Sequence, residues 1–207
     1  YNPRMSFRKE AAERRVVREL RFPPDGYVTY DPDGNCCEIV IATAYNTLTG
    51  RSIAVADLVR MGYRSNRFGG GQMAQQLNWS ETGPRRFYMK PFEIRASKRK
   101  VEETFRRHLS QGELIYLVVY INEWWEHVLE GHGDVGNSGH AVLIHEFEQE
   151  GKKTIFHIYD PLQWKDQGKI KVDLDQLWPT LFLMQGLEGE IDRLIGLEQV
   201  KFAVFTY

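Results

Sequence analysis

HAVLIHEFEQEGKKTIFHIYD, residues 140–160, holds two short stretches rich in β-branched and aromatic side chains, separated by Gln149–Lys152 with its single glycine. Such stretches on either side of a short polar turn are typical of a β-hairpin. We therefore expect strands at His140–Glu148 and Lys153–Asp160, joined by a four-residue turn. The hairpin predicts that the fold contains an antiparallel sheet.

The expected hairpin brings a histidine and a carboxylate together. With the turn centred between Glu150 and Gly151, counting back along both strands places His140 opposite Asp160 or one position away. Side chains that share a face at such a position have Cβ atoms roughly 5 Å apart, within reach of a hydrogen bond. A carboxylate that accepts from one imidazole nitrogen fixes the tautomer, and it leaves the other nitrogen free to act on a third group.

The rest of the chain indicates helices followed by antiparallel strands. Lys98–Ser110 has a helical pattern, whereas Arg60–Arg99, with three consecutive glycines and two prolines, has no regular one. Glu113–Ile121 is a continuous apolar run, as expected of a central strand covered on both faces, and Gln199–Tyr207 supplies a last alternating strand. This order predicts an α+β fold rather than a doubly wound one.

The third reactive group lies at the start of an expected helix. Cys36–Leu48 is apolar on all sides and is followed by Gly50, so we expect a buried helix with Asp33 and Asn35 as candidate N-caps. Its β-branched residues also allow a strand. A thiolate at a helix N-terminus is favoured by the helix dipole, and a neighbouring imidazolium lowers the thiol pKa further. Thiol, imidazole and carboxylate together are the parts of an activated nucleophile.

The two cysteines of the chain are adjacent, at positions 36 and 37. Adjacent cysteines do not bridge each other easily, which excludes a stabilising disulfide framework. The lack of a Cys-x-x-Cys pair excludes a structural zinc site built on thiolates. Burial and reactivity are the remaining roles. We expect Cys36 to be exposed for chemistry and Cys37 to point inward.

The composition is that of one ordinary soluble globular domain. The chain has 207 residues, with 27 basic against 28 acidic side chains and a net charge of −1. Such a balance gives no long-range field for a polyanion, so no nucleic-acid partner is expected. No apolar run approaches the roughly 18 residues of a membrane span. We expect a helical segment at residues 1–22 and one globular unit at residues 23–207, cut from a longer polypeptide.

Three short motifs, taken together, resemble a known family. They are Asn35-Cys36 opening an apolar helix that ends in Leu48-Thr49-Gly50-Arg51-Ser52-Ile53-Ala54-Val55, then Gly139-His140-Ala141-Val142, then Tyr159-Asp160-Pro161-Leu162-Gln163. In this order they resemble the papain-like cysteine hydrolases. They are more closely similar to the papain-fold toxin domains of bacterial polymorphic toxins and effectors. The match covers roughly Asp33 to Trp164.

The resemblance implies a papain-like fold, with the nucleophile at a helix start packed on a C-terminal antiparallel sheet. It also implies Cys36 as nucleophile, His140 as general base and acid, and Asp160 as the group that orients His140. Candidates for contacts with the oxyanion or the substrate are Asn35, Gly34 and Gln163. The chain departs from the family pattern in having its second cysteine directly after the first, and in Leu162 standing between Pro161 and Gln163.

No cofactor or metal is expected. The histidines at positions 127 and 132, with glutamates nearby, are five residues apart, unlike the four of a zinc-binding helix.

Glutamine deamidase activity is the expectation for this family, so the resemblance implies a hydrolase that acts on a glutamine side chain of a target protein. The same triad also serves a cysteine protease or a deubiquitinase-like peptidase. A third interpretation is an inactive papain-like module that binds proteins through the aromatic region around Trp124 and Trp125. Expected partners are a protein substrate and an immunity protein or activating partner. The family implies a bacterial protein secreted or delivered into the cytoplasm of a target cell.

Overall fold

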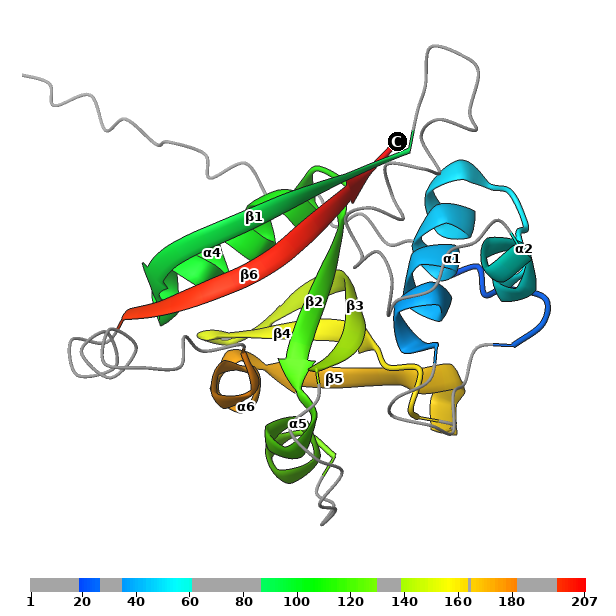
Figure 1. The fold of residues 1–207 in the computed structure, drawn as a ribbon. Coiled ribbons are helices and arrows are strands. Elements are labelled where there is room, and N and C mark those ends of the chain that lie inside the picture. The colour runs from blue at the N-terminus through cyan, green and yellow to red at the C-terminus, as the bar shows by residue number, and fades with distance from the viewer. Residues whose placement is uncertain (1–18, 27–34, 61–86, 130–138, 164, 182–196) are drawn as a thin grey trace, which may run out of the picture.

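The computed structural model describes residues 19–26, 35–60, 87–129, 139–163, 165–181 and 197–207 (Figure 1). Its strands are β1 (Tyr88–Ser97), β2 (Leu114–Tyr120), β3 (Gly139–Glu150), β4 (Lys153–Tyr159), β5 (Lys169–Asp173) and β6 (Leu197–Thr206). Its helices are α1 (Cys36–Thr49), α2 (Val55–Arg60), α4 (Lys98–Ser110), α5 (Ile121–His127) and α6 (Leu174–Leu177), with 3₁₀ turns η1 (Lys165–Gly168) and η2 (Trp178–Thr180). The expected α+β class is confirmed.

The strands form one six-stranded sheet in the order β1-β6-β2-β3-β4-β5, and every neighbouring pair is antiparallel. The two edge strands, β1 and β5, were not expected from the sequence. Strand β1 occupies the end of Arg60–Arg99, where the sequence shows no regular pattern, and it carries Pro91. Proline has no N–H for the ladder, so it is tolerated on an edge strand such as this one.

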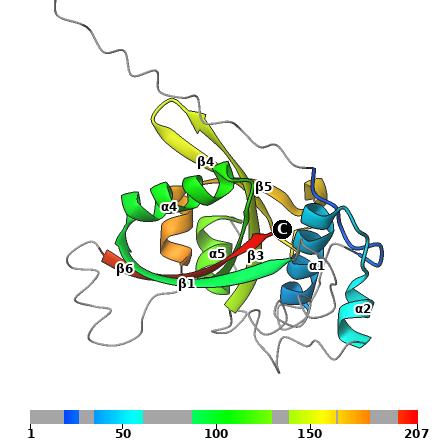
Figure 2. The ribbon, with the colours of Figure 1, turned by 90° about the horizontal axis from the view of Figure 1, so that it is seen from above.

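Apolar side chains cover both faces of the sheet. On one face α1 packs against Ala141, Leu143 and Tyr159. On the other face α4, α5 and α6 pack against the alternate residues of the same strands, which include Val142, Ile144 and Ile158. Figure 2 shows α1 and α2 apart from α4, α5 and α6, with strands between them. Because β3 and β4 carry core residues on both faces, they hold the two layers together.

The buried helix expected after Asn35 is confirmed, and a strand at this position is excluded. Helix α1 is apolar on all sides because it lies between the sheet and α2. Gly50 ends it in the left-handed region, with φ of 75°, and donates its N–H to the Asn46 carbonyl at 3.0 Å. Asn35 occupies the N-cap position, but its side chain makes no capping hydrogen bond. Asp33, the other candidate cap, lies outside the described residues.

The expected hairpin is present, with a shorter turn. Glu150 pairs with Lys153, so Gly151 and Lys152 alone form the turn, and its centre lies one residue later than expected. Gly151 has φ of 63°, the left-handed conformation that a two-residue hairpin turn needs. A β-bulge at His145, between Ile144 and Glu146, then shifts the register of β3 by one residue.

The beginning of the chain is described only in part. Of the helical segment expected at residues 1–22, residues 1–18 lie outside the described part, and residues 19–22 are not helical. Leu20 is buried in the core on the α1 side, and the Phe22 ring lies 5.1 Å from the Tyr159 ring, centroid to centroid. No helix in the described part of the chain is long and apolar enough to cross a membrane.

The loop after β4 returns the chain to Asp160 through a left-handed turn. Asp166, Gln167 and Gly168 have φ angles of 48°, 56° and 74°, and the Asp160 N–H donates to the Gly168 carbonyl at 2.8 Å. A Cβ on Gly168 would lie 2.5 Å from the Asp160 carbonyl oxygen and 2.9 Å from the Tyr159 ring. Only glycine allows the chain to pass so close to Asp160.

Gly168→Ala should therefore destabilise the protein more than Gly151→Ala. Both glycines have left-handed φ, which costs alanine about 1 kcal/mol. Gly151 has no atom within 4 Å of the added Cβ, whereas Gly168 meets the Asp160 backbone. Overpacking of this kind adds about 1–3 kcal/mol. The difference is measured as the shift of the urea unfolding midpoint, and equal shifts for the two variants would contradict the close packing.

Candidate active site

His140 and Asp160 meet as the sequence predicts. His140 Nε2 lies 2.7 Å from Asp160 Oδ1, and neither side chain has exposed surface. His140 is the second residue of β3, and Asp160 directly follows the last residue of β4. The pair is thus held at the ends of two neighbouring strands by their backbone ladder.

The bulge at His145 explains how the two side chains reach each other. Beyond it the last paired residues are Leu143 and Tyr159, so one step further Val142 lies opposite Asp160. Residues two apart on a strand share a face, and His140 is two residues from Val142. Without the bulge, Tyr159 would pair with Ile144, and Asp160 would share the opposite face. The expected proximity is confirmed, although the register that produces it differs from the expected one.

The Asp160 carboxylate accepts hydrogen bonds from three donors. Besides His140 at Oδ1, the Leu162 backbone N–H donates to Oδ1 at 2.8 Å, and the Trp124 indole Nε1–H donates to Oδ2 at 2.8 Å. A buried carboxylate without such partners would be unfavourable by several kcal/mol, because nothing would replace its lost hydration. Because both oxygens are occupied, the carboxylate is fixed in one orientation.

The other ring nitrogen of His140, Nδ1, is available to a nearby thiol, that of Cys36. Nδ1 is buried and has no full hydrogen bond to any described residue. Cys36, the first residue of α1, lies close enough to the ring for each of the two groups to shift the pKa of the other. Asp160, His140 and Cys36 therefore follow one another in the order carboxylate, imidazole, thiol.

The burial of the two cysteines is the reverse of the expected one. Cys36 is 4% exposed and belongs to the core between α1 and the sheet, whereas Cys37 is only partly buried. Helix α1 contacts β3, and Cys36 packs in the core beside Ala141, the residue that follows His140. Cys37 accepts a hydrogen bond from the Tyr116 hydroxyl at 3.1 Å.

The two thiols differ in acidity, first because they interact with each other and second because His140 acts on Cys36. A hydrogen bond from Cys37, together with a hydrogen bond from His140 and its positive charge, lowers the pKa of Cys36 to about 4, although burial opposes this. The hydrogen bond to Cys36 and burial raise the pKa of Cys37 far above its usual range. Burial also raises the pKa of Tyr116, which faces Cys37. Cys36 is therefore the thiol that ionises.

His140 holds the matching positive charge. Burial lowers the pKa of His140, but the charge and hydrogen bond of Asp160, followed by those of Cys36, raise it to about 9. Between pH values of about 4 and about 9 the site thus contains a thiolate and an imidazolium. This pair is the form of a cysteine nucleophile that attacks carbonyl carbon.

The other candidate site residues are placed only in part. Gln163 donates its backbone N–H to the Asp160 carbonyl at 3.1 Å, so it closes the turn directly after the carboxylate. The Asn35 carbonyl accepts from the Ile39 N–H at 3.0 Å. Gly34 lies outside the described residues. Roles for these three in holding an oxyanion or a substrate stay predictions.

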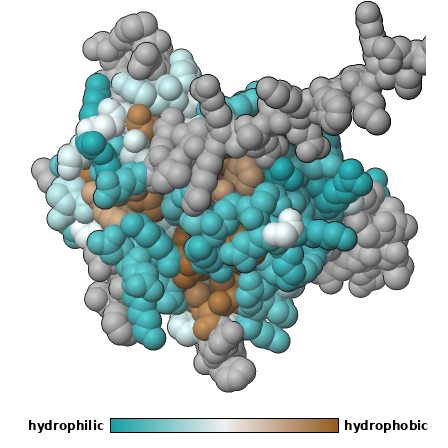
Figure 3. All heavy atoms as spheres, turned by 180° about the vertical axis from the view of Figure 1, so that it is seen from behind, coloured by the Kyte–Doolittle hydropathy of each residue, from teal (hydrophilic) through white to brown (hydrophobic). Residues whose placement is uncertain are grey.

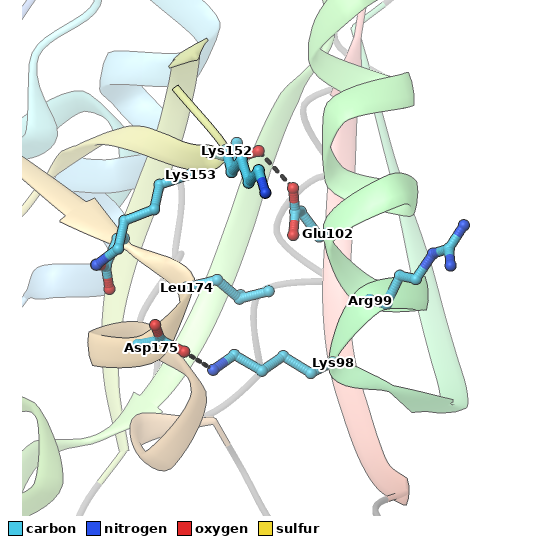
Figure 4. A pocket seen from close by; sticks show the side chains of 9 residues that line it. Lys98, Arg99, Glu102, Lys152, Lys153, Leu174 and Asp175 are labelled. Atoms are coloured by element: carbon cyan, nitrogen blue, oxygen red, sulfur yellow. Dashed lines mark hydrogen bonds and ion pairs between the residues drawn. The ribbon is translucent and has the colours of Figure 1, made fainter. Parts of the chain in front are cut away.

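Two other polar clusters lie apart from Cys36. A cavity of about 390 Å³ between α4 and the β4–β5–α6 region is lined mostly by charged side chains, and Lys98 pairs with Asp175 across it (Figure 4). Within the described residues, Glu123, Glu126 and His127 are the one group whose ligand atoms gather closely enough to hold a metal ion. All three are exposed, and His132 lies outside the described residues. Neither cluster contains a residue expected at the active site.

No protein-family model matches the chain, and no curated protein does. The similarity to papain-like hydrolases therefore rests on the residues described above.

The sequence did not indicate the part that Trp124 plays at the site. It suggested a protein-binding region around Trp124 and Trp125, whereas the structure places Trp124 in the core, fully buried, with its indole N–H donating to Asp160. The sequence could have indicated only that a buried tryptophan needs an acceptor for its indole N–H. Nothing in the local pattern shows that the acceptor is a residue 36 positions away.

Cys36 should react with iodoacetamide at a rate that changes little between pH 5 and pH 8. Because its pKa lies below the ordinary 9.0, at about 4, the thiolate is already formed throughout this range. A free thiol reacts about tenfold faster with each pH unit over the same range. Alkylation is followed by peptide mass spectrometry, which separates Cys36 from Cys37.

Matched variants show which thiol is measured. Cys37→Ala should keep a flat profile, although its midpoint rises because a hydrogen bond to Cys36 is lost, whereas Cys36→Ala should abolish fast labelling. A rate that rises tenfold per pH unit in the native chain would show that Cys36 is an ordinary buried thiol.

Proposed function

We propose that the chain is a thiol-dependent hydrolase in which Cys36, His140 and Asp160 act as a triad, and that it deamidates a glutamine side chain of a target protein. The observation that carries the proposal is the sequence of contacts from buried Asp160 through His140 to a thiol whose pKa lies at about 4. This arrangement supplies a nucleophile, an acid and a group that orients the acid.

The first half of the reaction forms a thioester. The Cys36 thiolate attacks the carboxamide carbon, a C–S bond forms, and the carbonyl oxygen becomes an oxyanion. The imidazolium of His140 donates its Nδ1 proton to the amide nitrogen while Asp160 keeps hold of Nε2. The C–N bond breaks and ammonia leaves.

The second half restores the enzyme. His140, now neutral, accepts a proton from water at Nδ1, and the hydroxide attacks the thioester carbon. The C–S bond breaks, and Cys36 leaves as a thiolate beside the imidazolium. The product is a glutamate side chain, so the target gains a negative charge without a break in its backbone.

The recessed thiol favours a side-chain amide over a peptide bond. Cys36 is 4% exposed. A glutamine side chain is slender and carries its carbonyl at its end, so it can extend into a narrow opening. A peptide bond must bring two flanking residues with it, which requires an open groove. The burial of Cys36 therefore supports deamidation among the reactions that the triad can perform.

The inactive binding module has less support. Its expected contact surface was the aromatic region around Trp124 and Trp125, but Trp124 has no exposed surface. The large apolar side chains that are exposed in the described part of the chain are Tyr88 and Tyr207. The face shown in Figure 3 is mostly hydrophilic, with small hydrophobic patches. Cysteine peptidase activity on the same triad is tested by the experiment below.

The target protein, an immunity or activating partner, and delivery from a bacterium into the cytoplasm of another cell belong to the same proposal. They follow from the resemblance to papain-fold toxin domains.

Deamidation is tested by incubating the protein with bacterial and human cell lysates and with an N-blocked glutaminyl-glycine dipeptide. Native protein and Cys37→Ala should release ammonia and convert glutamine to glutamate, as read by peptide mass spectrometry. Cys36→Ala and His140→Ala should lower the rate by at least about 10³-fold, because they remove members of one catalytic unit.

The products distinguish the candidates. New peptide termini that depend on Cys36, without glutamate formation, would replace the deamidase by a peptidase. Lysates and dipeptide that are unchanged, together with a Cys36 thiol of ordinary reactivity, would overturn the hydrolase proposal.

A further inference from the structure

Trp124 links α5 to the candidate triad. It is fully buried, and its indole Nε1–H donates to Asp160 Oδ2 at 2.8 Å. The next residue, Trp125, lies on the same helix and is partly buried, yet its Nε1–H has no described partner. The two tryptophans thus differ in the one contact that reaches the site.

The contact holds the oxygen of Asp160 that His140 does not. Oδ1 accepts from His140 and from the Leu162 backbone, both in the β3–β4 region, whereas Oδ2 accepts from a different element, α5. With Oδ2 free, the carboxylate could rotate about its Cβ–Cγ bond.

We propose that Trp124 is a positioning residue of the triad: its indole N–H holds the Asp160 carboxylate in the orientation that bonds His140 Nε2, and through Asp160 and His140 it supports the reactive state of Cys36. The inference rests on the nucleophile of the proposed function, and it does not depend on what the substrate is. Trp124 itself does not face Cys36, since it contacts the far oxygen of Asp160.

The groups that act on the thiolate are few among the described residues. Cys36 is affected by Cys37, by His140 and by the backbone N–H of Ala141, and His140 is affected by Asp160 and Cys36. Tyr116 and Glu38 act on Cys37. Trp124 carries no charge, so a change caused by its removal has to pass through Asp160.

The test compares Trp124→Phe with Trp125→Phe, which remove the same N–H from neighbouring positions. In each full-length variant, the rate of Cys36 alkylation by iodoacetamide is measured as a function of pH. In Trp124→Phe the midpoint pH of the alkylation-rate profile should rise by about one unit. This is the effect expected when a hydrogen bond to a charged group is lost. Trp125→Phe should keep the native midpoint. Thermal unfolding of each variant shows that it is folded.

A profile for folded Trp124→Phe that matches the native one would show that Trp124 only fills the core. Equal shifts in both variants would likewise refute the inference. If Trp124→Phe does not fold, benzothienylalanine at position 124 keeps the bicyclic shape and replaces N–H by sulfur, and the same shift is expected. Failure of deamidation in the lysate experiment leaves this readout unaffected, so the two proposals fail separately.

Discussion

The arrangement of the site depends on the hydrogen bonds that hold one fully buried carboxylate, that of Asp160. Asp160 has no exposed surface, and an isolated carboxylate there would lose several kcal/mol of hydration free energy. Its hydrogen bonds come from β3, from the backbone after β4 and from α5. The carboxylate therefore has all its partners only when these three elements are packed together.

The β-bulge at His145 places His140 on the same face of the sheet as Asp160. In a regular hairpin without the bulge, His140 and Asp160 would lie on opposite faces of the sheet. One extra residue in β3 reverses the alternation for the rest of the strand. His145 is itself buried, and burial lowers its pKa to about 3. It is therefore neutral, and it adds no charge to the strand that carries His140.

The sequence predicts those parts of the fold whose signal is local. Helix α1 is apolar on all sides, and the hairpin strands are rich in β-branched residues, so both could be recognised without knowing their neighbours. Strands β1 and β5 could not, because they are half-exposed and acquire strand geometry by pairing with β6 and β4. The turn length depends on Gly151 adopting a left-handed φ, and the bulge leaves no mark in the sequence.

For the site, the residue types and their order along the chain were predictable from the sequence, whereas the directions in which the side chains point were not. The spacing of His140 and Asp160 about a turn indicates that they meet, and a cysteine at a helix start indicates a reactive thiol. Which of two adjacent thiols points inward depends on the rotation of α1 about its axis, and packing against β3 decides this. Because that rotation brings Cys36 close to both Cys37 and His140, the buried thiol is the acidic one: the hydrogen bond from Cys37 and the imidazolium together more than offset the effect of burial on its pKa.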